Sequence, residues 1–377
     1  MSSHQPLGGK LINTQFVILA IFALIAAIFL AERFIFGLGS VTNLNNGYPW
    51  GIWIAIDVVI GTAFGCGGFV MAILVYIFNK GKYHPLVRPA LMASLFGYSL
   101  GGMAVVLDLG RYWQVYNIFL PWYAQINSVM FEVALCVTAY TFVLWIEFTP
   151  VFLEKFGIEN LRQKLEKVLF AVIALGVLLP MMHQSSLGTM ILVAGFKLHP
   201  LWNTNLLPVL FLVSVAAMGY AIVTFEALLS SAGFKRPYDT TILNKLSGIM
   251  LVLLIGYMIM RFADLIMRGQ LGLALAGDIN GNMFIIENIL FLIPIVILIN
   301  PANRSKPRLL FIAAMSMLFA GAIFRINAYL VGFEPGGGWN YFPSVPELLV
   351  TLGIFSMEIM LYLIFVKRLP ILHRVEA

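Results

Sequence analysis

Residues 50–78 read WGIWIAIDVVIGTAFGCGGFVMAILVYIF and contain one charged residue, Asp57. A helix needs about 20 consecutive apolar residues to cross the hydrocarbon core of a bilayer. This stretch exceeds that length, and a helix satisfies its own backbone hydrogen bonds, as hydrocarbon requires. The stretch therefore predicts a transmembrane helix that carries one buried acid.

The whole chain shares this composition. Of its 377 residues, 61% are hydrophobic and 11% are charged, and the mean hydropathy is +0.94. Soluble domains carry about 25% charged residues, so lipid must be the solvent here, and we expect soluble catalytic machinery to belong to another subunit. We predict an all-α polytopic membrane protein with ten transmembrane helices, at 14–36, 50–78, 87–112, 124–149, 166–184, 204–231, 244–268, 280–300, 309–332 and 344–368.

The distribution of positive charge predicts the orientation of these helices. Most of the 23 Lys and Arg residues lie in alternate connections, beginning with Lys10 and ending with Lys367 and Arg368. Cytoplasmic loops of membrane proteins carry such an excess of Lys and Arg. We therefore expect both termini in the cytoplasm and residues 14–36 to be a retained first helix. The basic residues are scattered over short loops, which does not indicate nucleic-acid binding.

The predicted outer loops are rich in aromatic residues, glycine and proline. An aromatic belt at the membrane interface explains part of this composition. The three glycines that precede Trp339 allow a close backbone approach. We expect a protein-docking surface on the outer face, formed by 47–53, 111–123, 199–202 and 334–343.

A weak internal repeat divides the chain. Each half has an acid five residues after an asparagine, an Asp followed by an Arg near an outer helix end, and a tryptophan near the start of its first helix. The matched positions are Asn127 and Glu132 with Asn282 and Glu287, Asp108 and Arg111 with Asp264 and Arg268, and Trp50 with Trp202. We predict one integral membrane domain, 1–377, containing two four-helix bundles at 50–184 and 204–332, flanked by the first and last helices.

Four titratable residues are predicted to lie at similar depth in the first bundle. They are Asp57, Asp108, Glu132 and His183, each near the outer end of a different predicted helix. A charge at the bilayer centre costs about 2.5–3.5 kcal/mol, so such residues usually face a bundle interior or handle protons. The pattern predicts a polar pocket that binds a small head group and exchanges protons. The alternative is structural, with an Asp108–Arg111 pair and Asp57 capping the bundle.

Glu132 has no basic residue three or four positions away, which makes it the strongest candidate for proton transfer. Glu147 and Glu226 lie near inner helix ends. They form either the entrance of a proton path or a pair of side chains that reach the interface by snorkelling.

The second bundle differs in its charges. Arg261, Asp264 and Arg268 share one helical face, which predicts local ion pairs. Arg325 is expected to neutralise Glu287.

The cysteines and histidines limit the cofactors. Cys66 and Cys136 lie in apolar runs, which does not suggest a disulfide, a zinc site or an iron–sulfur cluster. A transmembrane b-type haem is usually held by two histidines, and only one of the five touches a predicted span. We therefore predict no haem and no metal site among His4, His84, His183, His199 and His373.

Several segments together resemble the NrfD-type family, the membrane subunits of polysulphide reductase and related enzymes. The resemblance runs from about residue 7 to 370 and is nearest to the membrane subunits of respiratory [NiFe]-hydrogenases. The segments that carry it are LGGK at 7–10, FGLGSV at 36–41, PWGIWIAID at 49–57, YHPLVRPALMASLFGYSLGG at 83–102, DLGRYW at 108–113, NSVMFE at 127–132, MHQSS at 182–186, HPLW at 199–202, LALAGD at 273–278 and PGGGWNYFP at 335–343.

This resemblance implies a subunit of a hydrogen:quinone oxidoreductase in the bacterial inner membrane. It would receive electrons from a ferredoxin-like iron–sulfur subunit on the periplasmic face, next to the small and large [NiFe]-hydrogenase subunits. It would pass them to menaquinone and couple this step to proton movement. The implied proton-transfer residues are Glu132, Asp57, Asp108 and His183, and the residues expected to border the quinone are Trp50, Trp53, Tyr112, Arg111 and His183.

Three other functions stay open. The chain is either a quinone-reactive subunit of this kind, the membrane anchor of a polysulphide or nitrite reductase, a secondary transporter, or a passive anchor. Transport is disfavoured because the two halves lack matched Gly/Pro breaks at the midplane.

Overall fold

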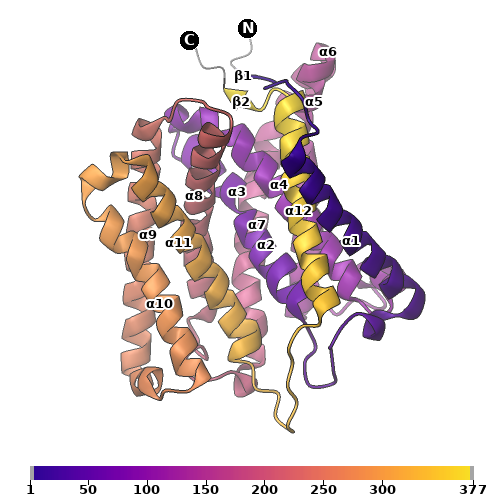
Figure 1. Ribbon diagram of the computed structural model, residues 1–377, viewed down its shortest axis with the longest axis vertical. Helices are drawn as coiled ribbons and strands as arrows, with labels where there is room; N and C mark the ends of the chain where they lie inside the picture. The colour runs from indigo at the N-terminus through magenta and orange to yellow at the C-terminus, as the bar shows by residue number, and fades with distance from the viewer. Residues whose placement is uncertain (1–3, 374–377) are drawn as a thin grey trace. The chain divides into compact units, whose positions relative to one another are not determined.

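The computed structural model describes residues 4–373 and is almost entirely helical (Figure 1). Within these residues, ten helices are long and apolar enough to cross a membrane. The prediction of an all-α polytopic membrane protein is confirmed. The α-helices are α1 Thr14–Phe36, α2 Gly61–Phe64, α3 Gly67–Ala72, α4 Val87–Asp108, α5 Val129–Phe156, α6 Glu159–Glu166, α7 Leu169–Val193, α8 Leu207–Gly233, α9 Thr240–Met267, α10 Ile279–Leu298, α11 Pro307–Ile326 and α12 Val345–Arg368.

Shorter elements complete or connect these helices. Two spans contain π-helical turns, which are rare and often occur at functional sites. The π-helical segments are η2 Trp53–Ile60, η3 Ile73–Ile77 and η9 Asn327–Val331. The 3₁₀ segments are η1 Leu38–Ser40, η4 Gly81–Leu86, η5 Tyr112–Phe119, η6 Gly195–Lys197, η7 Leu271–Leu275 and η8 Pro301–Ser305, and the strands are β1 His4–Gln5 and β2 Leu372–His373.

Two predicted helix limits differ from the structure in ways that affect the site. Helix α5 begins at Val129 rather than 124, because the preceding AQINS is polar and Ser128 takes the N-cap position. Helix α7 continues to Val193 rather than ending at 184, because the apolar run LGTMILV extends it. Glu132 therefore lies in the first turn of its helix, and His183 lies well inside its helix rather than at its end.

The chain divides into two compact units. Unit 1 comprises 1–62, 91–176 and 335–377, and unit 2 comprises 63–90 and 177–334. Unit 2 contains α8 to α11, which are the four helices of the predicted 204–332 bundle. The predicted 50–184 bundle is distributed over both units, and its grouping as a single bundle stays a prediction.

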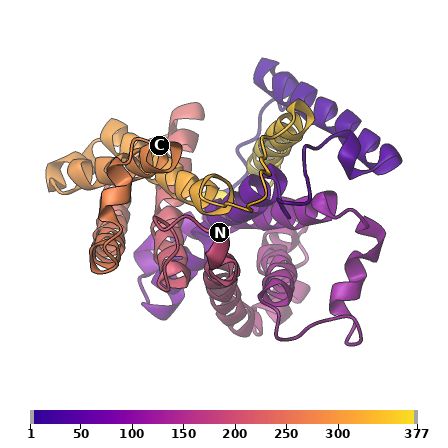
Figure 2. The same cartoon turned by 90° about the horizontal axis from the view of Figure 1, so that it is seen from below.

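In unit 1, α1 and α12 lie side by side, as Figure 1 and Figure 2 both show. They pass close together at Gly353, where a Cβ atom would lie 2.2 Å from the Cβ of Ala26. Small residues allow transmembrane helices to pack this closely. Near the ends of the chain, β1 and β2 pair antiparallel with His4 opposite His373.

In unit 2, α8 packs against α3, α9 and α11. Gly219 permits the contact with α3, because a Cβ atom there would lie 2.8 Å from the backbone oxygen of Cys66. Large side chains fill the rest of this core, including Phe211, Tyr257 and Phe291, which are fully buried. This tight packing fixes the helices that carry the polar residues of unit 2.

Candidate functional site

The π-helical segment η2 brings two predicted site residues into the core of unit 1. Asp57 is 4% exposed, and one of its carboxyl oxygens accepts a hydrogen bond of 2.8 Å from the hydroxyl of Thr351 on α12. Trp53 is 1% exposed, and its indole nitrogen donates a hydrogen bond of 3.2 Å to the backbone oxygen of Glu347. Helix α12 therefore holds both residues.

Glu347 is a buried acid that the sequence reasoning did not identify. It is 1% exposed, and one carboxyl oxygen accepts a hydrogen bond of 2.6 Å from the hydroxyl of Tyr341. The other oxygen accepts hydrogen bonds from the backbone N–H groups of Ser344, at 2.8 Å, and Asn43, at 3.0 Å. The motif Ser-x-x-Glu at 344–347 forms a capping box, so this signal was present in the sequence.

Asp108 ends α4 and is half-buried. The charges that act on it come from Glu347 and Arg33. Arg33 is 1% exposed, and it donates hydrogen bonds to the backbone oxygens of Leu107, at 2.8 Å, and Leu109. The alternative Asp108–Arg111 pair is not among the ion pairs formed within residues 4–373. The helix predicted for 87–112 ends at Asp108, so Arg111 lies after the helix, where its side chain is exposed.

Four more of the predicted site residues belong to unit 1. Glu132 is half-buried in the first turn of α5, and Trp50 is half-buried before η2. The ring of Tyr112 lies 4.8 Å below the guanidinium of Arg33. Glu147 is half-buried and faces Gly176, where a Cβ atom would lie 2.2 Å from its carboxyl oxygen.

His183 and Glu226 belong to unit 2. His183 is fully buried in α7, and the charge of Arg325 acts on it. Glu226 is half-buried in α8. The predicted set of four titratable residues is thus distributed as Asp57, Asp108 and Glu132 in unit 1 and His183 in unit 2, and their role as one site stays a prediction.

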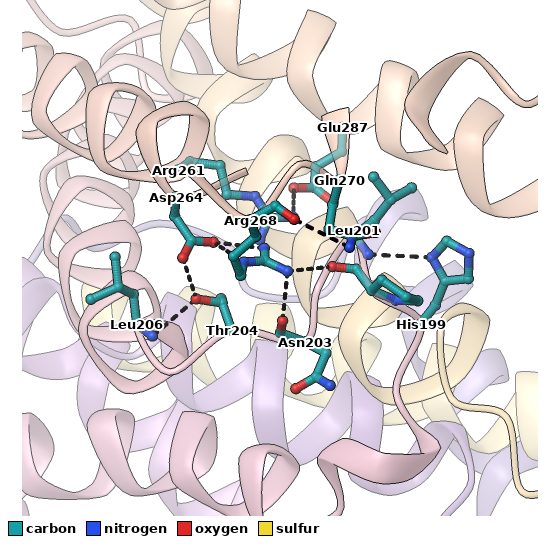
Figure 3. Close-up of polar contacts among 11 residues, drawn as sticks. His199, Leu201, Asn203, Thr204, Leu206, Arg261, Asp264, Arg268, Gln270 and Glu287 are labelled. Carbon is teal, nitrogen blue, oxygen red and sulfur yellow. Dashed lines mark hydrogen bonds and ion pairs between the residues drawn. The ribbon is translucent and has the colours of Figure 1, made fainter. Parts of the chain in front are cut away.

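The core of unit 2 contains a buried ion pair (Figure 3). Glu287 and Arg261 are both 0% exposed, and their side chains lie 3.4 Å apart. The other oxygen of Glu287 accepts hydrogen bonds from Trp202, at 2.9 Å, and Asn327, at 2.8 Å. We predicted Arg325 as the partner of Glu287, and the structure shows Arg261 in that role. Helix rotation, which the sequence does not give, turns Arg261 toward α10.

A second ion pair in unit 2 fixes the loop before α8. Arg268 donates two hydrogen bonds, of 2.6 and 2.8 Å, to the same oxygen of Asp264. It also donates to the backbone oxygens of Pro200 and Asn203, while Thr204 donates to the other oxygen of Asp264 (Figure 3). The prediction of local pairing on α9 is confirmed for Asp264 and Arg268.

The acids of the two units therefore have different partners. Asp57 and Glu347 are bonded to neutral hydroxyls and backbone N–H groups, whereas Glu287 and Asp264 are bonded to guanidinium groups. Protonating Glu287 would leave a buried guanidinium without its counter-charge, which is costly. Asp57 accepts its bond from a neutral hydroxyl, so its protonation would leave no cation without a counter-charge.

The glycine-rich loop of unit 1 has the backbone that its sequence requires. Gly336, Gly337 and Gly338 have φ values of 79°, 64° and 75°, which side chains rarely adopt. The following Trp339 is 46% exposed and packs so close to Gly47 that a Cβ atom there would lie 2.4 Å from it. These glycines shape the loop, and a docking role for it stays a prediction.

The match to known proteins covers almost the whole chain. Residues 40–331 match the family model described as polysulphide reductase, NrfD. The chain belongs to the NrfD family. As in the prediction from sequence, it is a multi-pass membrane protein of this family. Helices α1 and α12 lie outside the matched residues. Glu347 and Thr351 of α12, which bond to Trp53 and Asp57, therefore lie outside the NrfD match.

Relatives extend the similarity to both ends. The chain is 46% identical over 371 residues to the probable Ni/Fe-hydrogenase 2 b-type cytochrome subunit of Escherichia coli K12, covering 98% of this chain and 95% of that protein. It is 27% identical over 378 residues to the integral membrane subunit of menaquinone reductase from Nitratidesulfovibrio vulgaris Hildenborough, covering 89% and 86%. It is 25% identical over 411 residues to a selenate reductase subunit from Mesobacillus selenatarsenatis, covering 95% and 94%.

The name of the Escherichia coli relative mentions a b-type cytochrome, which raises the question of a haem. A haem held by two imidazoles needs two histidines inside neighbouring spans. Among residues 4–373, His183 is buried within a span, whereas His84 is exposed and His199 lies in a loop. His4 and His373 belong to the short sheet of the termini. These residues do not fit a bis-histidine haem.

Proposed function

We propose that this chain is the quinone-reactive membrane subunit of a respiratory [NiFe]-hydrogenase complex. It would pass electrons from a ferredoxin-like iron–sulfur subunit, which receives them from the hydrogenase small and large subunits on the periplasmic face, to menaquinone. The NrfD family membership and the names of the hydrogenase and menaquinone reductase relatives support this proposal.

The observation that carries the proposal is the environment of Asp57. This acid is buried in a membrane-spanning segment, is bonded to the neutral hydroxyl of Thr351, and lies one helical turn from the buried indole of Trp53. Reduction of a quinone to a quinol takes up two electrons and two protons, so its site needs acids that can exchange protons within the membrane. An aromatic side chain beside such an acid offers a flat surface to a quinone ring.

Within this proposal, the predicted residues have separate roles. Asp57, Asp108 and Glu132 exchange protons, and His183 donates a hydrogen bond. Trp50, Trp53, Tyr112 and Arg111 border the quinone head group. Glu147 and Glu226 supply protons from the cytoplasmic side, where both termini lie, and the reaction then contributes to proton translocation.

The test compares two electron acceptors in membranes that contain the assembled complex. The variants are Asp57→Asn and Glu132→Gln, and the control is Glu159→Gln on the exposed helix α6. Hydrogen oxidation is measured with a soluble dye, which accepts electrons outside the membrane, and with a menaquinone analogue.

We expect Asp57→Asn and Glu132→Gln to retain dye reduction and to lower quinone reduction about 100-fold or more, because a positioned proton-transfer group typically contributes about 10²–10⁴-fold. The control should retain both activities. If both variants reduce the quinone analogue at the rate of the unmodified complex, the chain is a passive anchor. If deletion of the whole chain changes neither activity, the hydrogenase assignment is wrong.

A further inference from the structure

Helix α12 supplies the groups that bond to Trp53 and Asp57 in unit 1, although it lies outside the NrfD match. The match ends at residue 331, and α12 begins at Val345. One turn apart on this helix, the backbone oxygen of Glu347 accepts a hydrogen bond from Trp53 and the side chain of Thr351 donates one to Asp57. The position of α12 therefore determines where the tryptophan and the acid of η2 lie.

The carboxylate of Glu347 fixes the start of α12 through three hydrogen bonds. It accepts hydrogen bonds from Asn43 in the segment before η2, from Ser344 at the start of α12, and from Tyr341 in the preceding loop. A buried carboxylate is stable when such donors surround it. Asn43 lies 304 positions before Glu347 in the sequence, so this side chain joins the segment before η2 to the beginning of α12.

Tyr341 extends this connection to η2 itself. Its hydroxyl donates to Glu347 at 2.6 Å and accepts a hydrogen bond of 3.0 Å from the backbone N–H of Ile52, the residue before Trp53. Burial and the hydrogen bond to Glu347 raise the pKa of Tyr341. The hydroxyl therefore keeps its proton and can act as donor and acceptor at once.

We infer that Glu347 is a positioning residue for quinone reduction: through Tyr341 and the start of α12, it holds Trp53 and Asp57 in the arrangement that binds the quinone head group. This inference rests on the proposed function. It adds α12 to the site. Among its hydrogen bonds in residues 4–373, Glu347 has no partner of opposite charge, so the inference gives it a role other than pairing with a cation.

The decisive variant is Glu347→Gln. Glutamine is accepted at this position of a capping box, so α12 should still begin at Val345. Its amide oxygen can still accept hydrogen bonds from the N–H groups of Ser344 and Asn43, but its NH₂ group cannot accept one from the hydroxyl of Tyr341. A second variant, Tyr341→Phe, keeps the ring and removes the bonds to Glu347 and Ile52. The matched control is Glu159→Gln, an exposed Glu of unit 1.

The readout is the separation of KM from kcat for a menaquinone analogue, in membranes that contain the whole complex. We expect Glu347→Gln to raise the KM several-fold and Tyr341→Phe to raise it about 10-fold, as expected for loss of one and of two hydrogen bonds that shape a binding site. We expect kcat to change less than about 3-fold, because the groups that exchange protons are still present. Dye reduction should match that of Glu159→Gln, which shows that the subunits that oxidise hydrogen are still active.

The outcomes separate this inference from the proposed function. If Glu347→Gln and Tyr341→Phe leave the KM unchanged while Asp57→Asn abolishes quinone reduction, Glu347 has no positioning role and the proposed function stands. If Asp57→Asn also leaves quinone reduction unchanged, the proposed function itself is wrong. If Glu347→Gln alone loses dye reduction, its KM cannot be read and Tyr341→Phe, which retains the carboxylate, decides: a raised KM supports the inference, and an unchanged KM refutes it.

Discussion

The buried ion pair of unit 2 allows a quantitative prediction of stability. Arg261 and Glu287 are both 0% exposed, with 3.4 Å between their charged groups. Replacing Arg261 by Met removes the cation and keeps much of the side-chain volume. The carboxylate of Glu287 then retains the hydrogen bonds from Trp202 and Asn327 but has lost its counter-charge.

The size of the effect follows from this burial. Removing one partner of a buried pair costs about 3–5 kcal/mol, because the remaining charge is uncompensated. A cost of about 4 kcal/mol lowers the ratio of folded to unfolded protein roughly 1000-fold. The surface pairs of Arg162 with Glu159 and Glu166 supply the control, because the three side chains are 29%, 58% and 45% exposed. Arg162→Met should cost less than about 1 kcal/mol.

The assay is unfolding of the purified protein by titration with SDS in mixed micelles, followed by tryptophan fluorescence. A third variant, Arg261→Met combined with Glu287→Gln, should recover most of the lost stability. The glutamine is neutral, and its amide oxygen can still accept hydrogen bonds from Trp202 and Asn327. The reasoning is refuted if Arg261→Met costs no more than Arg162→Met, or if the double variant is less stable than Arg261→Met alone.

Three further predictions concern packing and pH. Gly219→Ala should destabilise unit 2 by about 1–3 kcal/mol, because its Cβ atom would lie 2.8 Å from the backbone oxygen of Cys66; unfolding by SDS measures this, and an unchanged midpoint would contradict it. Gly353→Ala should weaken the packing of α12 on α1 by a similar amount, because the added atom would lie 2.2 Å from the Cβ of Ala26; faster proteolysis of unit 1 is expected, and equal cleavage rates would count against the contact. Burial and the bond to Glu347 raise the pKa of Tyr341 above 10.0, so its contribution to stability is present below about pH 10 and is lost as the pH rises further; thermal unfolding should become more sensitive to alkali in the unmodified protein than in Tyr341→Phe, and equal sensitivity would show that folding does not raise the pKa of this hydroxyl.

The hydrophobic segments were predictable because a membrane span depends on local composition. A run such as 50–78 must be helical in hydrocarbon whatever its neighbours are, so length and hydropathy suffice. The limits of α1 and α12 agree within one residue with the prediction. The predicted start of α5 was wrong because the polar residues at 124–128 belong to the loop before the helix. The predicted end of α7 was wrong because its apolar sequence continues past the polar residues of MHQSS at 182–186.

The partners of the buried polar residues were less predictable. Spacing along one helix found the Asp264–Arg268 pair, because residues four positions apart share a helical face. The same reasoning missed that Glu287 pairs with Arg261 rather than with Arg325, and it missed Glu347 altogether. Glu347 lies within a capping box and was not recognised as a buried acid, since its burial depends on Tyr341 and on a segment some 300 positions earlier.

The sequence by itself determined that this is a ten-helix membrane protein, where its helices lie, and which residues are too polar for the membrane they cross. It also carried enough of the NrfD pattern to indicate the family. Only the tertiary structure decided which of these polar residues are bonded to arginine and which to neutral groups. The physical reason is that insertion into lipid depends on each segment's own transfer free energy, whereas a side chain's partner depends on the rotation and packing of helices that the chain brings together from far apart.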